Sequence, residues 1–238
     1  MMPITLPTGT GMRARHFTPL VLALALAGTA LVAQTVRGWV SYARTPSSFS
    51  ETRTSLETEM AGLALSIPGN MLRHGLPPAG ADRASDSLDL TVLWPSMEGY
   101  SQANADAFAD FGDTSPVMSV ALRADDGQMD TNTRFEKVWL SLAAGDALPG
   151  PAGLALLPLV ADSSAGTDFV AHRSENGQLF AARCFTPRDR NLAATCQRTL
   201  RSETGLVVSY RFRQAHLADW RKLDGAMRGL VASFVRGN

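Results

Sequence analysis

Runs of hydrophobic residues divide the chain into a short N-terminal segment and a longer part with alternating patterns. Residues 17–36 contain no charged side chain and are rich in Leu, Val and Ala. A helix rises about 1.5 Å per residue and a bilayer core is about 30 Å thick, so roughly twenty such residues span it. We therefore predict a membrane anchor over residues 17–36, in contact with the lipid bilayer, after a disordered tail over residues 1–16.

A cleaved secretory signal is the alternative interpretation of the same segment. The two arginines before it would form the positive region, and residues 28–30 a small-residue cleavage site. The hydrophobic run continues to Ala33, however, and Trp39 and Tyr42 follow where aromatic rings favour the headgroup layer. These flanks favour an anchor. Both interpretations send the rest of the chain across the membrane.

After a predicted linker over residues 37–60, the pattern changes to short runs that indicate one domain over residues 61–238. We expect strands at residues 62–67, 71–74, 87–94, 116–123, 153–160, 168–172, 178–185, 195–201 and 206–213. Helical spacing predicts a helix from Asp130 or Thr131 to residue 144, and a closing helix over residues 215–235. The predicted fold class is α+β, with a mostly antiparallel sheet packed by a long C-terminal amphipathic helix.

The strand over residues 206–213 predicts the two faces of that sheet. Leu206, Val208, Tyr210 and Phe212 face one way, and Val207, Ser209, Arg211 and Arg213 face the other. Such alternation indicates an antiparallel sheet with one buried and one wetter side.

The order of these elements resembles that of PsbP/Mog1-like domains over most of residues 61–236. The likeness is carried by the strand over residues 206–213 and by the helix with Trp220, Leu223, Leu230 and Phe234. It implies a secreted or membrane-tethered accessory protein, a class in which many members lack catalysis. The segment 94–100, WPSMEGY, departs from that pattern. The chain also resembles membrane-anchored proteins of Gram-negative bacteria.

The two cysteines, Cys184 and Cys196, lie between strand-like runs with eleven residues separating them. This arrangement suits a disulfide formed in an oxidising compartment, and two unrelated reduced thiols are the alternative. The paired CxxC spacing of a zinc site is missing, so we expect no metal. Together with the anchor, the pair predicts a single-pass protein of the bacterial inner membrane, with its C-terminal domain in the periplasm. Secretion after signal cleavage is the alternative location.

The net charge of zero conceals an asymmetry. Residues 45–168 carry 6 basic and 17 acidic side chains, whereas residues 169–238 carry 12 basic and 5 acidic ones. Either the two halves complement each other across one sheet, or a basic face meets anionic lipid or an acidic partner. No recognition motif supports nucleic acid as a partner.

The sequence contains no nucleophile elbow, P-loop or dinucleotide-binding motif, so we assign no catalytic residue and no cofactor. Two groups remain as interaction candidates: Trp94, Glu98 and Tyr100 in the segment 94–100, and Arg198, Arg211 and Arg213 from an arginine-rich set. The alternatives are that Trp94 ends a core strand, that a short helix over residues 102–111 tucks its Phe side chains into the core, and that the arginines form a solvated sheet face.

These observations favour a non-enzymatic, membrane-anchored periplasmic protein. It would bind a protein partner as an interaction module or as an accessory subunit of an inner-membrane complex. A small-molecule or lipid-binding module that uses the aromatic segment as a lid is the second hypothesis. A hydrolase with a spatially assembled site is the third.

Overall fold

The computed structural model describes residues 25–33, 49–74, 86–160 and 165–236, and it divides the chain into two compact units. In the first unit, Met1–Ser47, residues 25–33 are helical. Among the described residues, no helix combines the length and hydrophobicity needed to cross a bilayer. The predicted tail, and residues 17–24 and 34–36 of the predicted anchor, lie outside the described residues.

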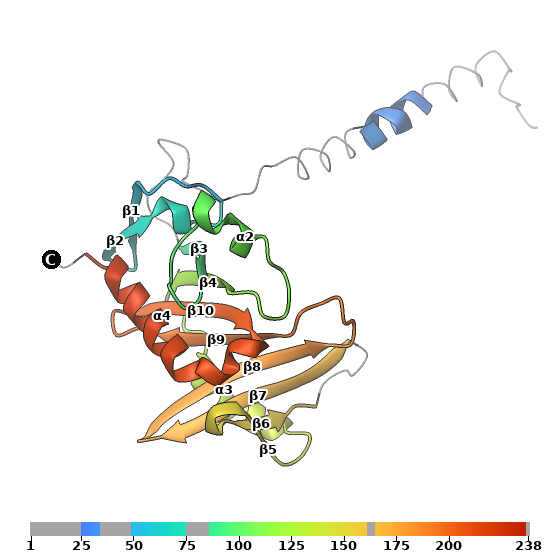
Figure 1. Ribbon diagram of the computed structural model, residues 1–238, viewed down its shortest axis with the longest axis vertical. Coiled ribbons are helices and arrows are strands. Elements are labelled where there is room, and N and C mark those ends of the chain that lie inside the picture. The colour runs from blue at the N-terminus through green and yellow to red at the C-terminus, as the bar shows by residue number, and fades with distance from the viewer. Residues whose placement is uncertain (1–24, 34–48, 75–85, 161–164, 237–238) are drawn as a thin grey trace, which may run out of the picture. The chain divides into compact units, whose positions relative to one another are not determined.

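The second unit, Ser48–Asn238, contains an eight-stranded antiparallel sheet and a separate hairpin (Figure 1). The order in the sheet is β3 (Ser87–Leu93), β4 (Val117–Ala124), β10 (Leu206–Arg213), β9 (Thr195–Arg201), β8 (Gln178–Pro187), β7 (Gly166–Glu175), β6 (Ala155–Pro158) and β5 (Leu148–Pro149). The hairpin consists of β1 (Ser55–Met60) and β2 (Leu63–Pro68). The predicted α+β class with a mostly antiparallel sheet is confirmed.

Helical segments connect and cover the strands. The α-helices are α2 (Ala105–Phe108), α3 (Thr131–Lys137) and α4 (Trp220–Phe234), and the 3-10 segments are η1 (Gly69–Met71), η2 (Gln102–Asn104), η3 (Trp139–Leu142), η4 (Pro151–Gly153) and η5 (Gln214–Asp219). The side chain of Asp130 accepts a hydrogen bond from the backbone N–H of Thr133 at 2.7 Å, and so caps α3 as expected.

Three local predictions differ from the structure. The expected helix to residue 144 ends at Lys137, because Val138 leaves helical geometry, and η3 follows. Residues 71–74 form no regular strand, and in this stretch Leu72 makes a single bridge to Leu90. Ser55–Met60 forms β1, although its sequence was expected to belong to a linker. Its alternating side chains stabilise a strand only when the segment pairs with β2.

The main core lies between the sheet and α4, which crosses in front of it in Figure 1. From α4 the residues Trp220, Leu223, Met227, Val231 and Phe234 are buried, as helical spacing predicts. A second, smaller core lies on the opposite face of β6, β7 and β8, where Phe135 and Trp139 cover Val170 and Ala181. Only part of that second face is therefore covered.

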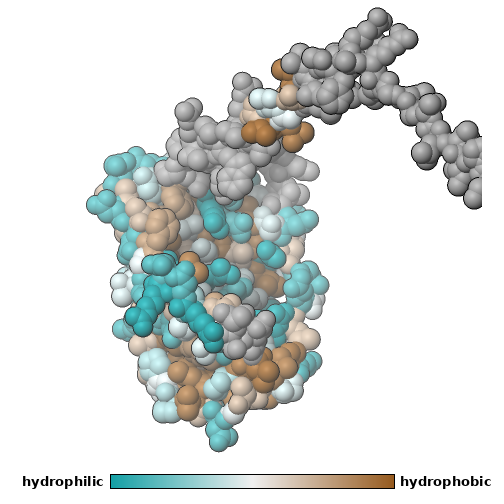
Figure 2. Space-filling view, turned by 90° about the vertical axis from the view of Figure 1, so that its right-hand side faces the viewer, coloured by the Kyte–Doolittle hydropathy of each residue, from teal (hydrophilic) through white to brown (hydrophobic). Residues whose placement is uncertain are grey.

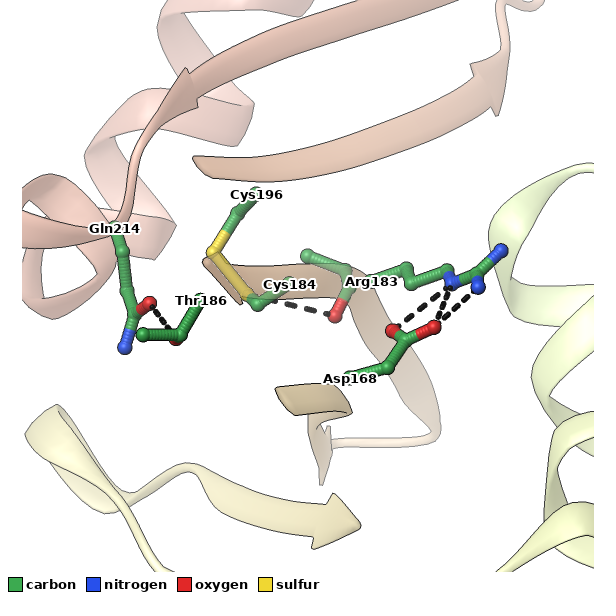
Figure 3. Close-up of a disulfide and its surroundings, with 7 residues drawn as sticks. Asp168, Arg183, Cys184, Thr186, Cys196 and Gln214 are labelled. Atoms are coloured by element: carbon green, nitrogen blue, oxygen red, sulfur yellow. Dashed lines mark hydrogen bonds and ion pairs between the residues drawn. A yellow bond between two sulfur atoms is a disulfide. The ribbon is translucent and has the colours of Figure 1, made fainter. Parts of the chain in front are cut away.

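The pairing between β8 and β9 is short compared with the length of these two strands. Their ladder extends only from Arg183 to Phe185 on β8, opposite residues 195–197 of β9, whereas β7 and β8 pair over ten residues. Cys184 and Cys196 lie directly opposite each other in this short ladder and form a buried disulfide (Figure 3). The predicted disulfide is confirmed.

Hydrophobic side chains remain exposed at one end of this unit. They gather at the lower end of the view in Figure 2, the end that carries β5 and β6 in Figure 1. Leu142 and Val160 are both exposed there and are joined by a backbone hydrogen bond of 2.8 Å.

Candidate functional site

A groove of about 560 Å³ lies on the open face of the sheet, opposite α4. Its floor is formed by outward-facing residues of β4, β10, β9 and β8, and its wall by α3, Trp139 and the loop before α3. It exists because strand alternation sends the hydrophobic residues to α4 and the polar ones to this face. The groove thus has a polar sheet floor and a helical wall.

Four side chains on the floor are joined by hydrogen bonds across β9 and β10. Arg211 donates to the Oε1 atom of Gln197 at 3.3 Å, and Gln197 donates through Nε2 to the hydroxyl of Ser209 at 3.0 Å. The hydroxyl of Thr199 also donates to Ser209 at 3.1 Å. The register explains the order, because Arg211 faces Gln197 and Ser209 faces Thr199. We call these four residues the polar ladder.

One charged pair closes the β8 side of the groove. The Nε atom of Arg183 donates to both carboxylate oxygens of the buried Asp168 at 3.0 Å, and the Nη2 atom contacts the same carboxylate (Figure 3). The side-chain hydrogen bond to Asp168 raises the pKa of Arg183. This arginine is therefore already neutralised within the fold, and a ligand would have to compete with Asp168 for it.

The remaining arginines of the groove are available. Arg123 on β4 and Arg134 on α3 are exposed and make no ion pair with any described residue, and Arg211 contacts only the neutral Gln197 there. Among the described residues, Asp126 and Asp168 are the acidic residues that line the groove. The carboxylate of Asp126 accepts a hydrogen bond from the side chain of Gln128. The groove is therefore positive, with four arginines and two aspartates.

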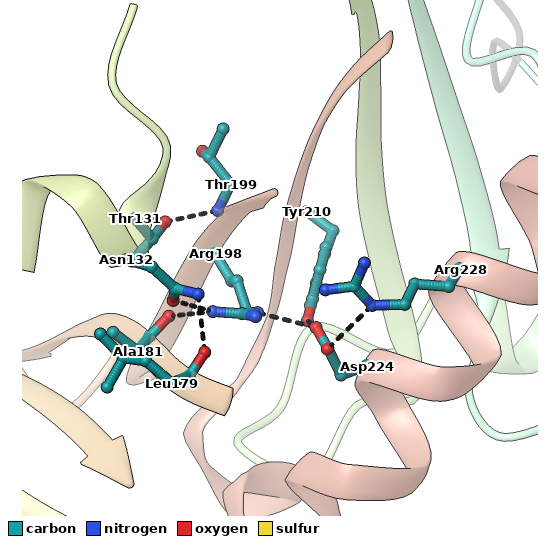
Figure 4. Close-up of polar contacts among 9 residues, drawn as sticks. All are labelled: Thr131, Asn132, Leu179, Ala181, Arg198, Thr199, Tyr210, Asp224 and Arg228. Carbon is teal, nitrogen blue, oxygen red and sulfur yellow. Dashed lines mark hydrogen bonds and ion pairs between the residues drawn. The ribbon is translucent and has the colours of Figure 1, made fainter. Parts of the chain in front are cut away.

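A buried polar network holds the wall in place (Figure 4). The Nη1 atom of Arg198 donates to the side chain of Asn132 and to the carbonyl oxygen of Ala181, both at 2.8 Å. Its Nε atom donates to Asp224 of α4 at 2.7 Å. Asn132 also donates to the carbonyl oxygen of Leu179. Where β8 and β9 no longer pair with each other, the start of α3 thereby supplies hydrogen-bond partners to strand backbone groups.

Charges in this network shift the pKa values of two groups. Burial by itself raises the pKa of Asp224, but the charge and hydrogen bond of Arg198, with smaller effects of Arg228 and Tyr210, hold it below the usual value. Burial is the largest cause that raises the pKa of Tyr210 well above its usual value, and the charge of Asp224 raises it further. Tyr210 therefore donates its hydroxyl proton to Asp224 at 2.9 Å.

The aromatic segment 94–100 lies away from the groove and contributes no residue to its lining. Trp94 is half-buried and packs against the main core, and Glu98 is exposed. Tyr100 is stacked on Phe49 and meets Phe108 edge-on, with ring centroids 5.6 and 5.3 Å apart. The short helix expected near residues 102–111 is present as η2 and α2, with Phe108 buried but Phe111 exposed.

The three predicted arginines are not brought together. Arg211 lies in the groove, whereas Arg213 donates to the carbonyl oxygen of Phe111 outside it. Arg198 was expected on a surface, but only 2% of it is exposed. Strand alternation explains why Arg198 is buried, because this residue lies on the same face of β9 as the buried Cys196 and Leu200.

The sequence interpretation did not choose five polar groove residues as interaction candidates: Arg123, Arg134, Gln197, Thr199 and Ser209. The alternation in residues 206–213 marked Ser209 as part of a wetter face, and the same period in residues 195–201 could have marked Gln197 and Thr199. Arg123 and Arg134 carry no local signal, because only the pairing of β4 with β10 and the position of α3 bring them there.

Comparisons with known proteins give one informative likeness. No protein-family model matches the chain, and no curated protein matches it in sequence. Among solved structures, the chain is similar to an immunity protein of the Stenotrophomonas maltophilia type IV secretion system. The TM-score is 0.55 at 15% sequence identity, over 78% of this chain and 95% of that chain. At this identity the likeness concerns the fold.

The expected relationship to PsbP/Mog1-like domains was wrong, because the structural likeness is to that immunity protein instead. The expectation depended on the order of strands and one closing helix. Many α+β folds share such an order, and it does not specify which strands become neighbours.

Proposed function

We propose that the unit Ser48–Asn238 is a non-enzymatic protein-binding module of the bacterial cell envelope. It acts as an immunity-type protein that binds a toxin partner and neutralises it. The single observation that carries the proposal is the open groove, where a polar sheet floor and three accessible arginines remain uncovered in the described chain. A surface of this kind offers many hydrogen-bonding groups on a rigid support, which suits recognition of another protein.

Two further observations support this proposal. The solved protein of similar fold is an immunity protein of a secretion system, and this role supports a protein partner for the present chain. The buried disulfide is a bond that persists in oxidising compartments such as the bacterial periplasm. Tethering by residues 17–36 at the inner membrane belongs to the same proposal and would hold the module at the periplasmic face.

Site-specific photo-crosslinking in cells tests the proposal. A photoreactive amino acid would replace Ser209 on the groove floor in one variant and the exposed Ser233 on α4 in a matched control. We expect a discrete protein adduct from the groove position and none from α4. The captured protein, once purified, should bind the full-length chain and lose its toxicity in that complex. Equal labelling from both positions, or no protein adduct from the groove, would contradict the proposal.

The location is tested separately. A reporter enzyme that is active only in the periplasm, fused after Asn238, should be active, and the full-length chain should fractionate with the inner membrane. Recovery of the whole chain from the cytosol with both thiols reduced would contradict the envelope assignment.

A further inference from the structure

We infer that the partner segment that enters the groove is an acidic stretch of polypeptide, bound by Arg123, Arg134 and Arg211. This inference rests on the proposed function and specifies the chemistry of the partner at the same site. The three side chains come from β4, α3 and β10 and all line the groove.

The charge of the groove opposes that of its domain. Beyond Thr45 the chain has 18 basic and 22 acidic residues, a net charge of −4. The groove lining nevertheless has four arginines against two aspartates, and one of these aspartates is engaged by Arg183. A positive concave site on an acidic molecule attracts carboxylates locally while the rest of the surface repels acidic proteins that do not fit.

The identity of the cations also favours carboxylates. Arginine has a planar guanidinium with five N–H donors, and it binds a carboxylate through two parallel hydrogen bonds. Arg123 and Arg134 have no ionic partner among the described residues, so a carboxylate would gain their charge without displacing an acid. Arg211 would exchange only a 3.3 Å hydrogen bond to the neutral Gln197.

The floor favours a polypeptide over a lipid surface. Gln197, Thr199 and Ser209 offer neutral donors and acceptors between the arginines, which suit the N–H and C=O groups of an extended backbone. That floor lies below the wall formed by α3 and the preceding loop. A bilayer surface is broad, so it would contact the rim before its headgroups reached the polar ladder.

Fluorescence anisotropy of a labelled decaglutamate peptide with the full-length protein in detergent tests the inference. The test variant combines Arg134→Glu and Arg211→Glu in the groove. The matched control combines Arg53→Glu and Arg73→Glu, two exposed residues outside the groove, so both variants change the net charge equally. Thermal unfolding would verify that both variants remain folded.

We expect the peptide to bind the wild type, with affinity falling about tenfold or more in the groove variant and less than about twofold in the control. A neutral decaglutamine peptide should not bind. Equal losses in both variants would reveal unspecific attraction and overturn the inference, as would failure of the wild type to bind decaglutamate. Groove-dependent binding to phosphatidylglycerol vesicles without binding to decaglutamate would also overturn it, in favour of a lipid.

Failure of this inference and failure of the proposed function give different results. If the groove photo-crosslinks a protein whose affinity is unchanged by Arg134→Glu with Arg211→Glu, the protein-binding function stands and the acidic chemistry is wrong. If decaglutamate binds in the groove but no cellular protein is captured there, the chemistry of the groove stands and the proposed partner class is wrong.

Discussion

The Nη1 atom of Arg198 on β9 donates a hydrogen bond of 2.8 Å to the carbonyl oxygen of Ala181 on β8, at a place where the two strands no longer pair. A side chain here replaces a ladder hydrogen bond. Because Arg198 also binds Asn132 of α3 and Asp224 of α4, it links one element on each face of the sheet to the point where the sheet divides. The wall of the groove therefore depends on the interior of the domain.

Loss of Arg198 should destabilise the domain far more than loss of Arg228, although both bind the carboxylate of Asp224. Arg198 is buried, whereas about half of the Arg228 side chain is exposed. Breaking a buried pair leaves an uncompensated charge, so Arg198→Met should lower the free energy of unfolding by about 3 kcal/mol, against about 0.4 kcal/mol for Arg228→Met. Urea unfolding of both variants measures this, and equal effects would contradict it.

Asp224 should make the free energy of unfolding of the domain depend on pH in the acidic range. Its pKa in the folded protein lies below the usual value, so the folded state favours the carboxylate, and this contribution is complete above about pH 4. As pH falls below that value and through the folded pKa, the contribution is lost. The difference in unfolding free energy between wild type and Asp224→Asn should therefore shrink below about pH 4. A constant difference from pH 7 to pH 2 would show that the charge of Asp224 is irrelevant.

Removing the disulfide should weaken the link between β8 and β9. Cys184 and Cys196 are 12 positions apart, and closing a loop of that length restricts the unfolded chain by about 3 kcal/mol. Replacing both with Ala should lower the free energy of unfolding by about that amount. Dithiothreitol should lower the stability of the wild type similarly and leave the double variant unchanged. A response of the double variant to the reductant would exclude the disulfide as the cause.

The hydroxyl of Thr131 should contribute to the seating of α3 on the sheet. This buried hydroxyl accepts a hydrogen bond from the backbone N–H of Thr199 at 2.6 Å. Thr131→Val keeps the shape but leaves that N–H without its acceptor, which should cost about 1–3 kcal/mol of unfolding free energy. Thr133→Val is the matched control, because its hydroxyl makes no hydrogen bond with a described residue, and it should cost less than about 0.5 kcal/mol. Equal costs would contradict the contact.

Gly99 should tolerate no side chain, because its backbone lies against that of Asn70. A Cβ atom there would be 2.7 Å from the carbonyl oxygen of Asn70, whereas one on Gly145 would meet no heavy atom within 4 Å. Gly99→Ala should therefore lower the free energy of unfolding by about 1–3 kcal/mol, and Gly145→Ala should leave it nearly unchanged. Thermal unfolding of the pair measures the difference. A neutral Gly99→Ala would show that the segment 94–100 can move away from η1.

Much of the fold could be predicted where the signal was local. The period of two in residues 195–201 and 206–213 matches β9 and β10 at both ends, and helical spacing placed the buried face of α4. The interpretation of Arg198 as a surface residue failed although its strand was correct. Its type indicated solvent, whereas its register indicated the core, and the compensating Asp224 lies on another element.

By itself, the sequence determined the α+β class, the strands of the meander, the polar face of β10 and the proximity that allows Cys184 to pair with Cys196, because each follows from the alternation or spacing of near neighbours. Only the tertiary structure decided that β4 lies beside β10 and that α3 covers part of the second face. Those placements depend on side chains far apart in the chain, and they assemble Arg123, Arg134 and Arg211 around one groove. Local pattern specifies which face of an element is polar, whereas packing between distant elements specifies which polar faces meet.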